Sequence, residues 1–245
     1  MQGTNKLLGL ISAVLVIFIW SGFIVFSRAG VTTNLTAYDV AALRFMVAGA
    51  AVLPFVYRWW PRQLPLNGQV IIMIFGPGVL YSILMYLGLT NASAAYGGVF
   101  ANGSMPIFTV LLGLLIAHDR PSKIQVIAIL VIVFGGLLVG VKGMMAGGPH
   151  IVSGIILFLS ASMVLSIYLF SVQRYNVKPT QALVLVNLPN ALFFIPLWYF
   201  FLPSGIHDVG WSTILFQAFF QGLGPGFFAI IFIALTAIHL GSTTT

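Results

Sequence analysis

One arginine, Arg44, lies inside a mostly apolar stretch of the sequence, residues 38–57. A guanidinium stays ionised at ordinary pH and can hold a carboxylate through two parallel hydrogen bonds. A charge inside such a stretch is costly and usually serves a function. We therefore predict that Arg44 binds the carboxylate of a small solute. The alternative is that it caps backbone carbonyl groups or anchors its helix at a membrane surface, because it lies only a turn or two into the stretch.

Uncharged polar and aromatic side chains interrupt the other apolar stretches and are further candidates for binding a solute. Asn187 and Asn190 are three residues apart, and Gln217 and Gln221 are four apart, so each pair shares one face of a helix. Each pair could line an aqueous cavity or join two helices. The full candidate set is Trp20, Ser21, Arg44, Tyr81, Tyr86, Asn102, Asn187, Asn190, Gln217 and Gln221.

Two Gly-Pro-Gly triplets are candidate hinges. One is Gly76, Pro77 and Gly78; the other, 148 residues later, is Gly224, Pro225 and Gly226. Proline removes a helical hydrogen bond and bends a helix, and such breaks bend the moving helices of transporters. The alternative is a helix that is merely loosened near one of its ends.

The composition is that of a membrane protein. The chain has 245 residues, 60% of them hydrophobic and only 5% charged, with a mean hydropathy of +1.10. Soluble domains carry about 25% charged residues. The net charge of +7 comes from Lys and Arg scattered between apolar runs, so we predict a lipid bilayer as the partner and no nucleic acid. Cysteine is absent, and we expect no catalytic residues, no metal site and no cofactor.

Eight apolar runs are long enough to cross a hydrocarbon core about 30 Å thick. They cover approximately residues 7–27, 38–57, 69–89, 94–117, 124–141, 151–171, 181–202 and 213–238. The predicted fold is therefore all-α, a polytopic membrane helical bundle. Seven basic residues fall in the N-terminus and the even-numbered loops, and two, Arg28 and Lys142, in the odd-numbered loops. This asymmetry predicts a cytoplasmic N-terminus.

The spacing of the two Gly-Pro-Gly triplets suggests an internal repeat. If the third span corresponds to the eighth, the repeating unit has five helices, and an odd number places the second copy upside down in the membrane. We predict a first repeat over residues 1–145, with helices 1–5. An incomplete second repeat would cover residues 146–245, with helices 6–8 and the start of helix 9. The linker would be Lys142 to His150, and we expect a chain truncated after its eighth helix, or a version lacking helices nine and ten.

Four segments of the first five spans form an ordered set of motifs. They are "FIWSGFIVFSRAG" in the first span, "LTAYDVAALRF" at the second, "YLGLTNASAAYGGVFANGSMPIFTVLLGLLI" across the third and fourth, and "DRPSKIQVIAILVIVFGGLLVG" at the fifth. Together these segments resemble the EamA family of the drug/metabolite transporter superfamily. Where the family often has a Glu near the end of helix four, this chain has His118, Asp119 and Arg120. The resemblance implies a ten-helix, inverted-repeat permease of the bacterial inner membrane that exports amino acids or similar metabolites.

The leading functional hypothesis is therefore a small-solute exporter that works by alternating access, as a monomer or homodimer. The three carboxylates, Asp39, Asp119 and Asp208, all lie near span ends, which favours transport without a fixed intramembrane carboxylate. The alternatives are a channel, a non-transporting membrane subunit or an inactive fragment. A membrane-embedded enzyme is disfavoured because three of the four histidines lie in predicted loops.

Overall fold

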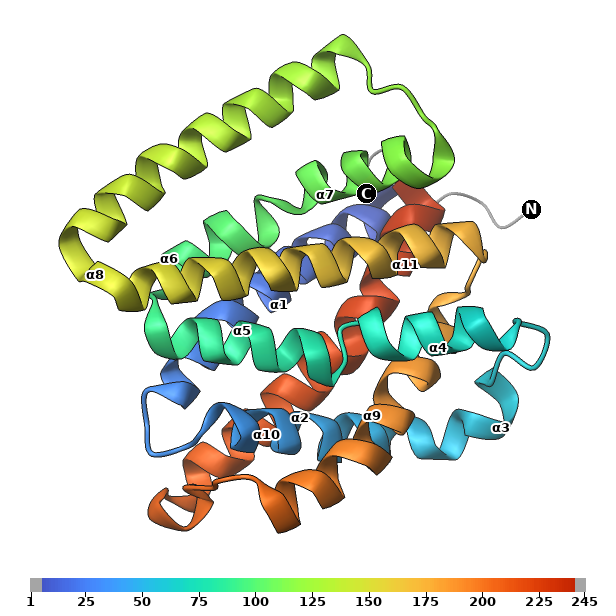
Figure 1. Cartoon of the computed structure of the whole chain (residues 1–245). Coiled ribbons are helices and arrows are strands. Elements are labelled where there is room, and N and C mark those ends of the chain that lie inside the picture. The colour runs from blue at the N-terminus through green and yellow to red at the C-terminus, as the bar shows by residue number, and fades with distance from the viewer. Residues whose placement is uncertain (1–5, 241–245) are drawn as a thin grey trace. The chain divides into compact units, whose positions relative to one another are not determined.

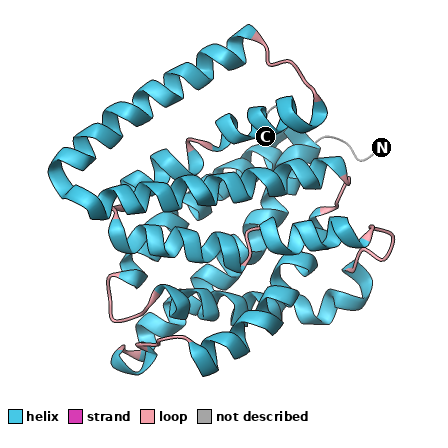
Figure 2. Ribbon diagram, viewed as in Figure 1, coloured by secondary structure: helices cyan, strands magenta, loops and turns pink. Residues whose placement is uncertain are grey.

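Every apolar run predicted from the sequence forms a helix, because backbone polar groups in a bilayer must be satisfied within their own segment. The structure is a computed structural model that describes residues 6–240; the side chains of residues 146–148, 233, 234 and 237–240 are not described. Figure 2 shows helices joined by short loops. Eight helices in this part of the chain are long and apolar enough to span a membrane, which confirms the predicted fold class. They are Lys6–Val31, Ala37–Trp59, Leu66–Asn91, Ala94–Ala117, Lys123–Met145, Pro149–Arg174, Pro179–Phe201 and Trp211–Phe232.

The chain divides into two compact units. Unit 1 comprises Met1–Arg62 and Val177–Thr245, and unit 2 comprises Gln63–Asn176. Unit 1 therefore contains spans one, two, seven and eight, and unit 2 contains spans three to six. The predicted repeats, with their boundary at residue 145, divide the same chain differently. The repeat stays a prediction.

In unit 1, the second span packs against both the seventh and the eighth. The elements in Figure 1 are α1 (Lys6–Val31), α2 (Ala37–Val52), η1 (Leu53–Phe55), α3 (Val56–Trp59), α9 (Pro179–Phe201), η4 (Ile206–Asp208), α10 (Trp211–Leu223), η5 (Gly224–Phe228) and α11 (Ala229–Leu240). Helix α2 lies against α9 and α10, while α1 lies along α11. Glycine permits the closest approach: a Cβ on Gly49 of α2 would lie 2.7 Å from that of Ala191 in α9.

In unit 2, the sixth span lies against the third and the fourth. The elements are α4 (Leu66–Phe75), α5 (Val79–Asn91), α6 (Ala94–Tyr96), the π-helix η2 (Gly97–Asn102), α7 (Met105–Leu112), the π-helix η3 (Gly113–Ala117) and α8 (Lys123–Arg174). Small residues make the contacts: a Cβ on Gly154 would lie 2.7 Å from that of Ala92.

Of two expectations about connections, one needs correction and the other falls outside the described residues. The predicted linker, Lys142 to His150, is not a loop, because α8 continues through it from Lys123 to Arg174 with Pro149 inside the helix. Figure 1 shows the two arms of α8 meeting at a bend. At the other end of the chain, α11 extends to Leu240, and the predicted start of helix nine at residues 241–245 lies outside the described residues.

Candidate functional site

Arg44 is buried inside unit 1. It lies in the middle of α2 and is 1% exposed. Its guanidinium carbon is 5.5 Å from the ring centroid of Phe23 in α1 and 5.6 Å from that of Phe45. Aromatic faces attract a guanidinium electrostatically, and more strongly where water is excluded. The side chain therefore sits in the helix packing of unit 1, and the alternative of an anchor at a membrane surface does not fit this burial.

Gln217 and Gln221 connect α10 to α1. Nε2 of Gln217 donates to the carbonyl oxygen of Phe26 at 2.8 Å. Nε2 of Gln221 donates to Oγ of Ser27 at 2.9 Å and to Oε1 of Gln217 at 3.2 Å. Both glutamines are at most 2% exposed, and Gly30 leaves the space that Gln217 occupies, since a Cβ there would lie 2.8 Å from its Cδ. In this state the two glutamines join two helices. Of the two alternatives for this pair, a cavity lining or a link between helices, the contacts match the second.

Asn187 connects α9 to the second Gly-Pro-Gly triplet. Its Nδ2 donates to the carbonyl oxygen of Leu183 in its own helix and to that of Gly226, both at 3.0 Å. Asn190 is half-buried and donates to the carbonyl oxygen of Val186, one turn earlier in α9. The two asparagines share a helical face, but their bonds differ. Asn187 reaches the triplet, whereas the bond from Asn190 stays within α9.

The remaining candidates of the first span are more open. Trp20 is half-buried, and Ser21 is exposed. Neither residue is buried as Arg44, Gln217 and Asn187 are. A binding role for these two side chains stays a prediction.

The candidates of unit 2 lie in spans three and four. Tyr81 and Tyr86 of α5 are 6% and 0% exposed, so both phenol rings lie in the interior of unit 2. Asn102 is half-buried and ends the π-helix η2. The helix is irregular here because the amide of Gly103 bonds five residues back, to the carbonyl oxygen of Gly98, at 3.1 Å. π-Helical segments are frequent at functional sites.

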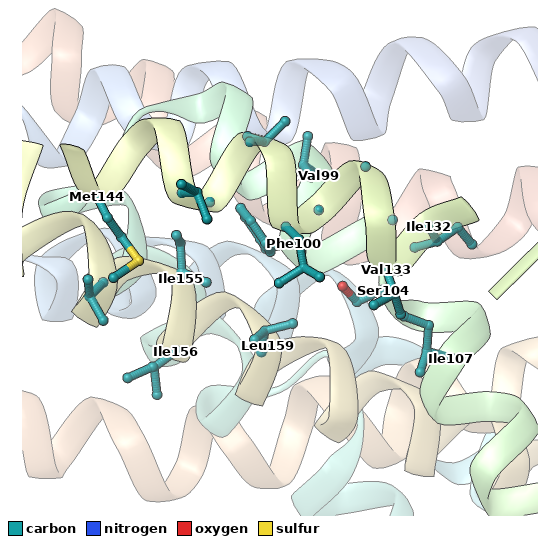
Figure 3. Close-up of a pocket in the computed structure, with 18 residues that line it drawn as sticks. Val99, Phe100, Ser104, Ile107, Ile132, Val133, Met144, Ile155, Ile156 and Leu159 are labelled. Atoms are coloured by element: carbon teal, nitrogen blue, oxygen red, sulfur yellow. The ribbon is translucent and has the colours of Figure 1, made fainter. Parts of the chain in front are cut away.

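A cavity of about 660 Å³ adjoins this irregular segment within unit 2. Figure 3 shows Phe100 and Ser104 from the fourth span, Val133 from the fifth and Leu159 from the sixth around it. Phe100 packs on the fifth span, where a Cβ on Gly140 would lie 3.5 Å from its ring. The lining carries no charged side chain. Its chemistry suits an apolar group rather than an ion.

The two Gly-Pro-Gly triplets both interrupt helices. Gly76, Pro77 and Gly78 separate α4 from α5, and Gly224, Pro225 and Gly226 begin the π-helix η5 between α10 and α11. Both breaks lie inside the third and eighth spans and not at a span end. A hinge role for the two triplets stays a prediction.

One cluster that was not predicted as part of a site surrounds Asp39 at the start of α2. The carboxylate accepts bonds from Nε1 of Trp198 at 2.8 Å, Oγ of Ser204 at 2.5 Å and the amide of Gly205 at 2.9 Å. It also accepts from the amide and hydroxyl of Thr36, at 2.8 and 3.0 Å. Asp39 thus completes the capping box of α2 and joins it to the end of α9. The spacing of Thr36 and Asp39 reveals the cap, but only the fold reveals Trp198 and Ser204.

Buried serines are the second group that sequence reasoning missed. Ser82 in α5 and Ser162 in α8 are both 0% exposed, and their hydroxyls have no hydrogen-bond partner within the described residues. Ser166, one turn further along α8, donates to the carbonyl oxygens of Ser162 and, at 3.3 Å, of Met105 in the fourth span. The four-residue spacing of Ser162 and Ser166 marks one helical face, but a serine alone is too common in membrane helices to single out.

The family follows from comparison with known proteins. A model described as the EamA-like transporter family matches residues 7–141, more than half of the chain. The chain belongs to the EamA-like transporter family. It is therefore a multi-pass membrane transporter of the drug/metabolite type, and the resemblance noted in the sequence is confirmed.

A solved structure supports the fold. One described as "Crystal structure of protein" superposes with a TM-score of 0.60 at 21% sequence identity, covering 94% of this chain and 78% of that chain. At 21% identity, this likeness bears only on the fold of the EamA-like transporter. No curated protein matches the chain at a significant level.

Proposed function

We propose that this EamA-like transporter exports amino acids with apolar side chains, or similar small amphiphilic carboxylates, by alternating access. The observation that carries the proposal is the buried guanidinium of Arg44, which lies near the rings of Phe23 and Phe45 in unit 1. Such a group binds a carboxylate strongly once water is excluded. The described state shields Arg44 from solvent, so the proposal requires a second state that exposes it to the solute.

The cavity of unit 2 supports the amphiphilic class. Its uncharged lining and its volume of about 660 Å³ would accept an apolar side chain, and Ser104 at its wall offers a hydroxyl. Solute pockets of this size are usually apolar with a few polar groups.

The pairing of helices supports the inverted repeat. If spans one and six correspond, and three and eight correspond, then a contact between one and eight requires a contact between six and three. The structure has α1 against α11 in unit 1, and α8 against α5 in unit 2. In unit 2, α5 follows the first Gly-Pro-Gly triplet directly. In unit 1, α11 follows the π-helix η5, which begins with the second triplet. Inverted repeats of this kind underlie alternating access in secondary transporters.

We further propose that the transporter lies in a bacterial inner membrane with a cytoplasmic N-terminus. The excess of Lys and Arg in the N-terminus and even-numbered loops supports this orientation. A reporter enzyme fused after Arg62 would be active as a cytoplasmic fusion; activity only as an exported fusion would contradict the orientation.

An export assay tests the proposed solute class. Cells that express the chain, and matched cells without it, are loaded with leucine or with leucinamide, which lacks the carboxylate. We expect leucine to appear in the medium only with the intact chain, and Arg44→Leu to abolish that export. Export of leucinamide at the same rate as leucine, or unchanged leucine export by Arg44→Leu, would contradict a carboxylate contact.

A further inference from the structure

The eighth span contains a break whose geometry is held from outside the span. Helix α10 ends at Leu223, the π-helix η5 covers Gly224–Phe228, and α11 begins at Ala229. Pro225 has no amide hydrogen, so the helical bond to the residue four positions earlier cannot form. A segment with a missing internal bond has less resistance to bending than a regular helix, and contacts from neighbouring helices decide its shape.

Two neighbouring helices make those contacts. From α9, Nδ2 of Asn187 donates to the carbonyl oxygen of Gly226 at 3.0 Å. From α2, Ala48 lies so close that a Cβ on Gly226 would be 3.2 Å from its Cβ, and a Cβ on Gly222 would be 2.5 Å from that of Val47. The break is therefore seated against α2 and tied to α9 by one side chain.

Asn187 is not fully satisfied by this arrangement. The residue is 1% exposed, and its Nδ2 serves both Leu183 and Gly226, whereas its Oδ1 has no hydrogen-bond partner within the described residues. A buried oxygen without a partner costs free energy, which offsets much of what the bond to Gly226 contributes. The hydrogen bond from Asn187 to Gly226 is consequently directional but weak. These are the properties of a contact that can break and re-form.

We propose that Asn187 is a positioning residue that latches the break of span eight to α9, and that each transport cycle opens this latch. The second part rests on the proposed function. The latch acts on one side of the break only, since Gln217 and Gln221 hold α10 to α1 on the other side. Opening it frees η5 and the start of α11 while α10 stays in place.

Amide hydrogen exchange on the purified full chain in lipid nanodiscs tests the latch without any transport. Asn187→Ser keeps a hydroxyl that can bond to the carbonyl of Leu183 but cannot reach Gly226, and Asn187→Leu removes both bonds. We expect amides of residues 226–231 to exchange about three- to twentyfold faster in both variants, the range that single interhelical bonds in membranes support. Amides of α10 should exchange at the wild-type rate.

Ser12→Ala is the matched control, because Ser12 is a buried polar residue of the same unit whose hydroxyl bonds within its own helix, to Leu8. It should leave residues 226–231 unchanged. The latch would be overturned if residues 226–231 of Asn187→Ser exchanged at the wild-type rate. An increase in exchange of equal size throughout unit 1 would also overturn it. If Asn187→Leu fails to fold, the exchange rates of Asn187→Ser are the test.

Flux measurements then separate the latch from the proposed function. For leucine export, Asn187→Ser should change the maximal rate at least threefold and leave KM within twofold. A changed KM at constant maximal rate would overturn the role in the cycle. Faster local exchange with no leucine export even by the wild type would leave the latch standing and contradict the proposed function.

Discussion

Both compact units contain close glycine contacts, but they differ in how far side-chain hydrogen bonds join their helices. In unit 1, side chains donate hydrogen bonds between helices, from Trp198 to Asp39, from Gln221 to Ser27 and from Asn187 to Gly226. In unit 2, glycine and alanine bring helices into direct contact, as where Gly88 leaves room for the ring of Phe158 and Gly154 meets Ala92. Hydrogen bonds have a direction and define one geometry, whereas contacts between small residues depend mainly on distance. Unit 1 should therefore have the better defined internal arrangement, and unit 2 should tolerate small displacements of its helices.

The largest effect on stability is expected when the carboxylate of Asp39 is replaced, which tests whether hydrogen bonds define the arrangement of unit 1. In Asp39→Asn, an amide hydrogen donor replaces one oxygen where Trp198, Ser204, Gly205 and Thr36 all supply donors. We expect a loss of about 3 kcal/mol in the free energy of unfolding, because donors to a buried charged group lose their acceptor. Reversible unfolding in mixed micelles measures it.

Asp208→Asn is the control for that loss. Asp208 is exposed, so its substitution should change the free energy of unfolding by no more than about 0.5 kcal/mol. Equal losses in the two variants would mean that the bonds to Asp39 contribute little to unit 1.

A methyl group in the close contact between the third and sixth spans of unit 2 should have the next largest effect. The added Cβ of Gly88→Ala would lie 2.5 Å from the ring of Phe158, which is fully buried. We expect a loss of about 2 kcal/mol from overpacking, with partial recovery when Phe158→Leu is added. The same unfolding assay applies.

Gly135→Ala provides the matched substitution in the same unit, since nothing lies within 4 Å of its added Cβ. Alanine favours a helix over glycine, so this change should leave stability equal or raise it by up to about 1 kcal/mol. A loss as large as that of Gly88→Ala would show that small-residue contact is not what holds unit 2.

The smallest expected effects compare single interhelical bonds. Gln221→Leu removes the bond to Ser27 in unit 1 and should cost about 1 kcal/mol. Ser166→Ala removes a longer bond of 3.3 Å to Met105 in unit 2 and should cost about 0.5 kcal/mol. If Ser166→Ala proved the more costly, unit 2 would depend on polar bonds as much as unit 1.

The sequence predicted the helices because hydrophobic length is a local property. Eight runs of apolar residues became eight spans, and Pro77 and Pro225 marked breaks that the structure contains. The linker near Pro149 was predicted wrongly, because glycine and proline indicate a turn but a proline is tolerated inside a membrane helix.

The partners of the polar residues were not predictable in the same way. Spacing showed that Gln217 and Gln221 share a face, but not that this face meets Phe26 and Ser27, which are about 190 positions away. Such pairings depend on which spans become neighbours, and apolar runs carry little information about their neighbours. The division into two units was unpredictable for the same reason.

Counterflow in proteoliposomes tests the central claim most directly, that this EamA-like transporter moves its solute by alternating access. Vesicles that contain the purified chain are loaded with unlabelled leucine and diluted into a trace of labelled leucine. We predict a transient accumulation of label above its equilibrium level, at a rate that saturates with leucine concentration. Entry of label that rises linearly with concentration and never exceeds equilibrium would contradict alternating access and indicate a channel.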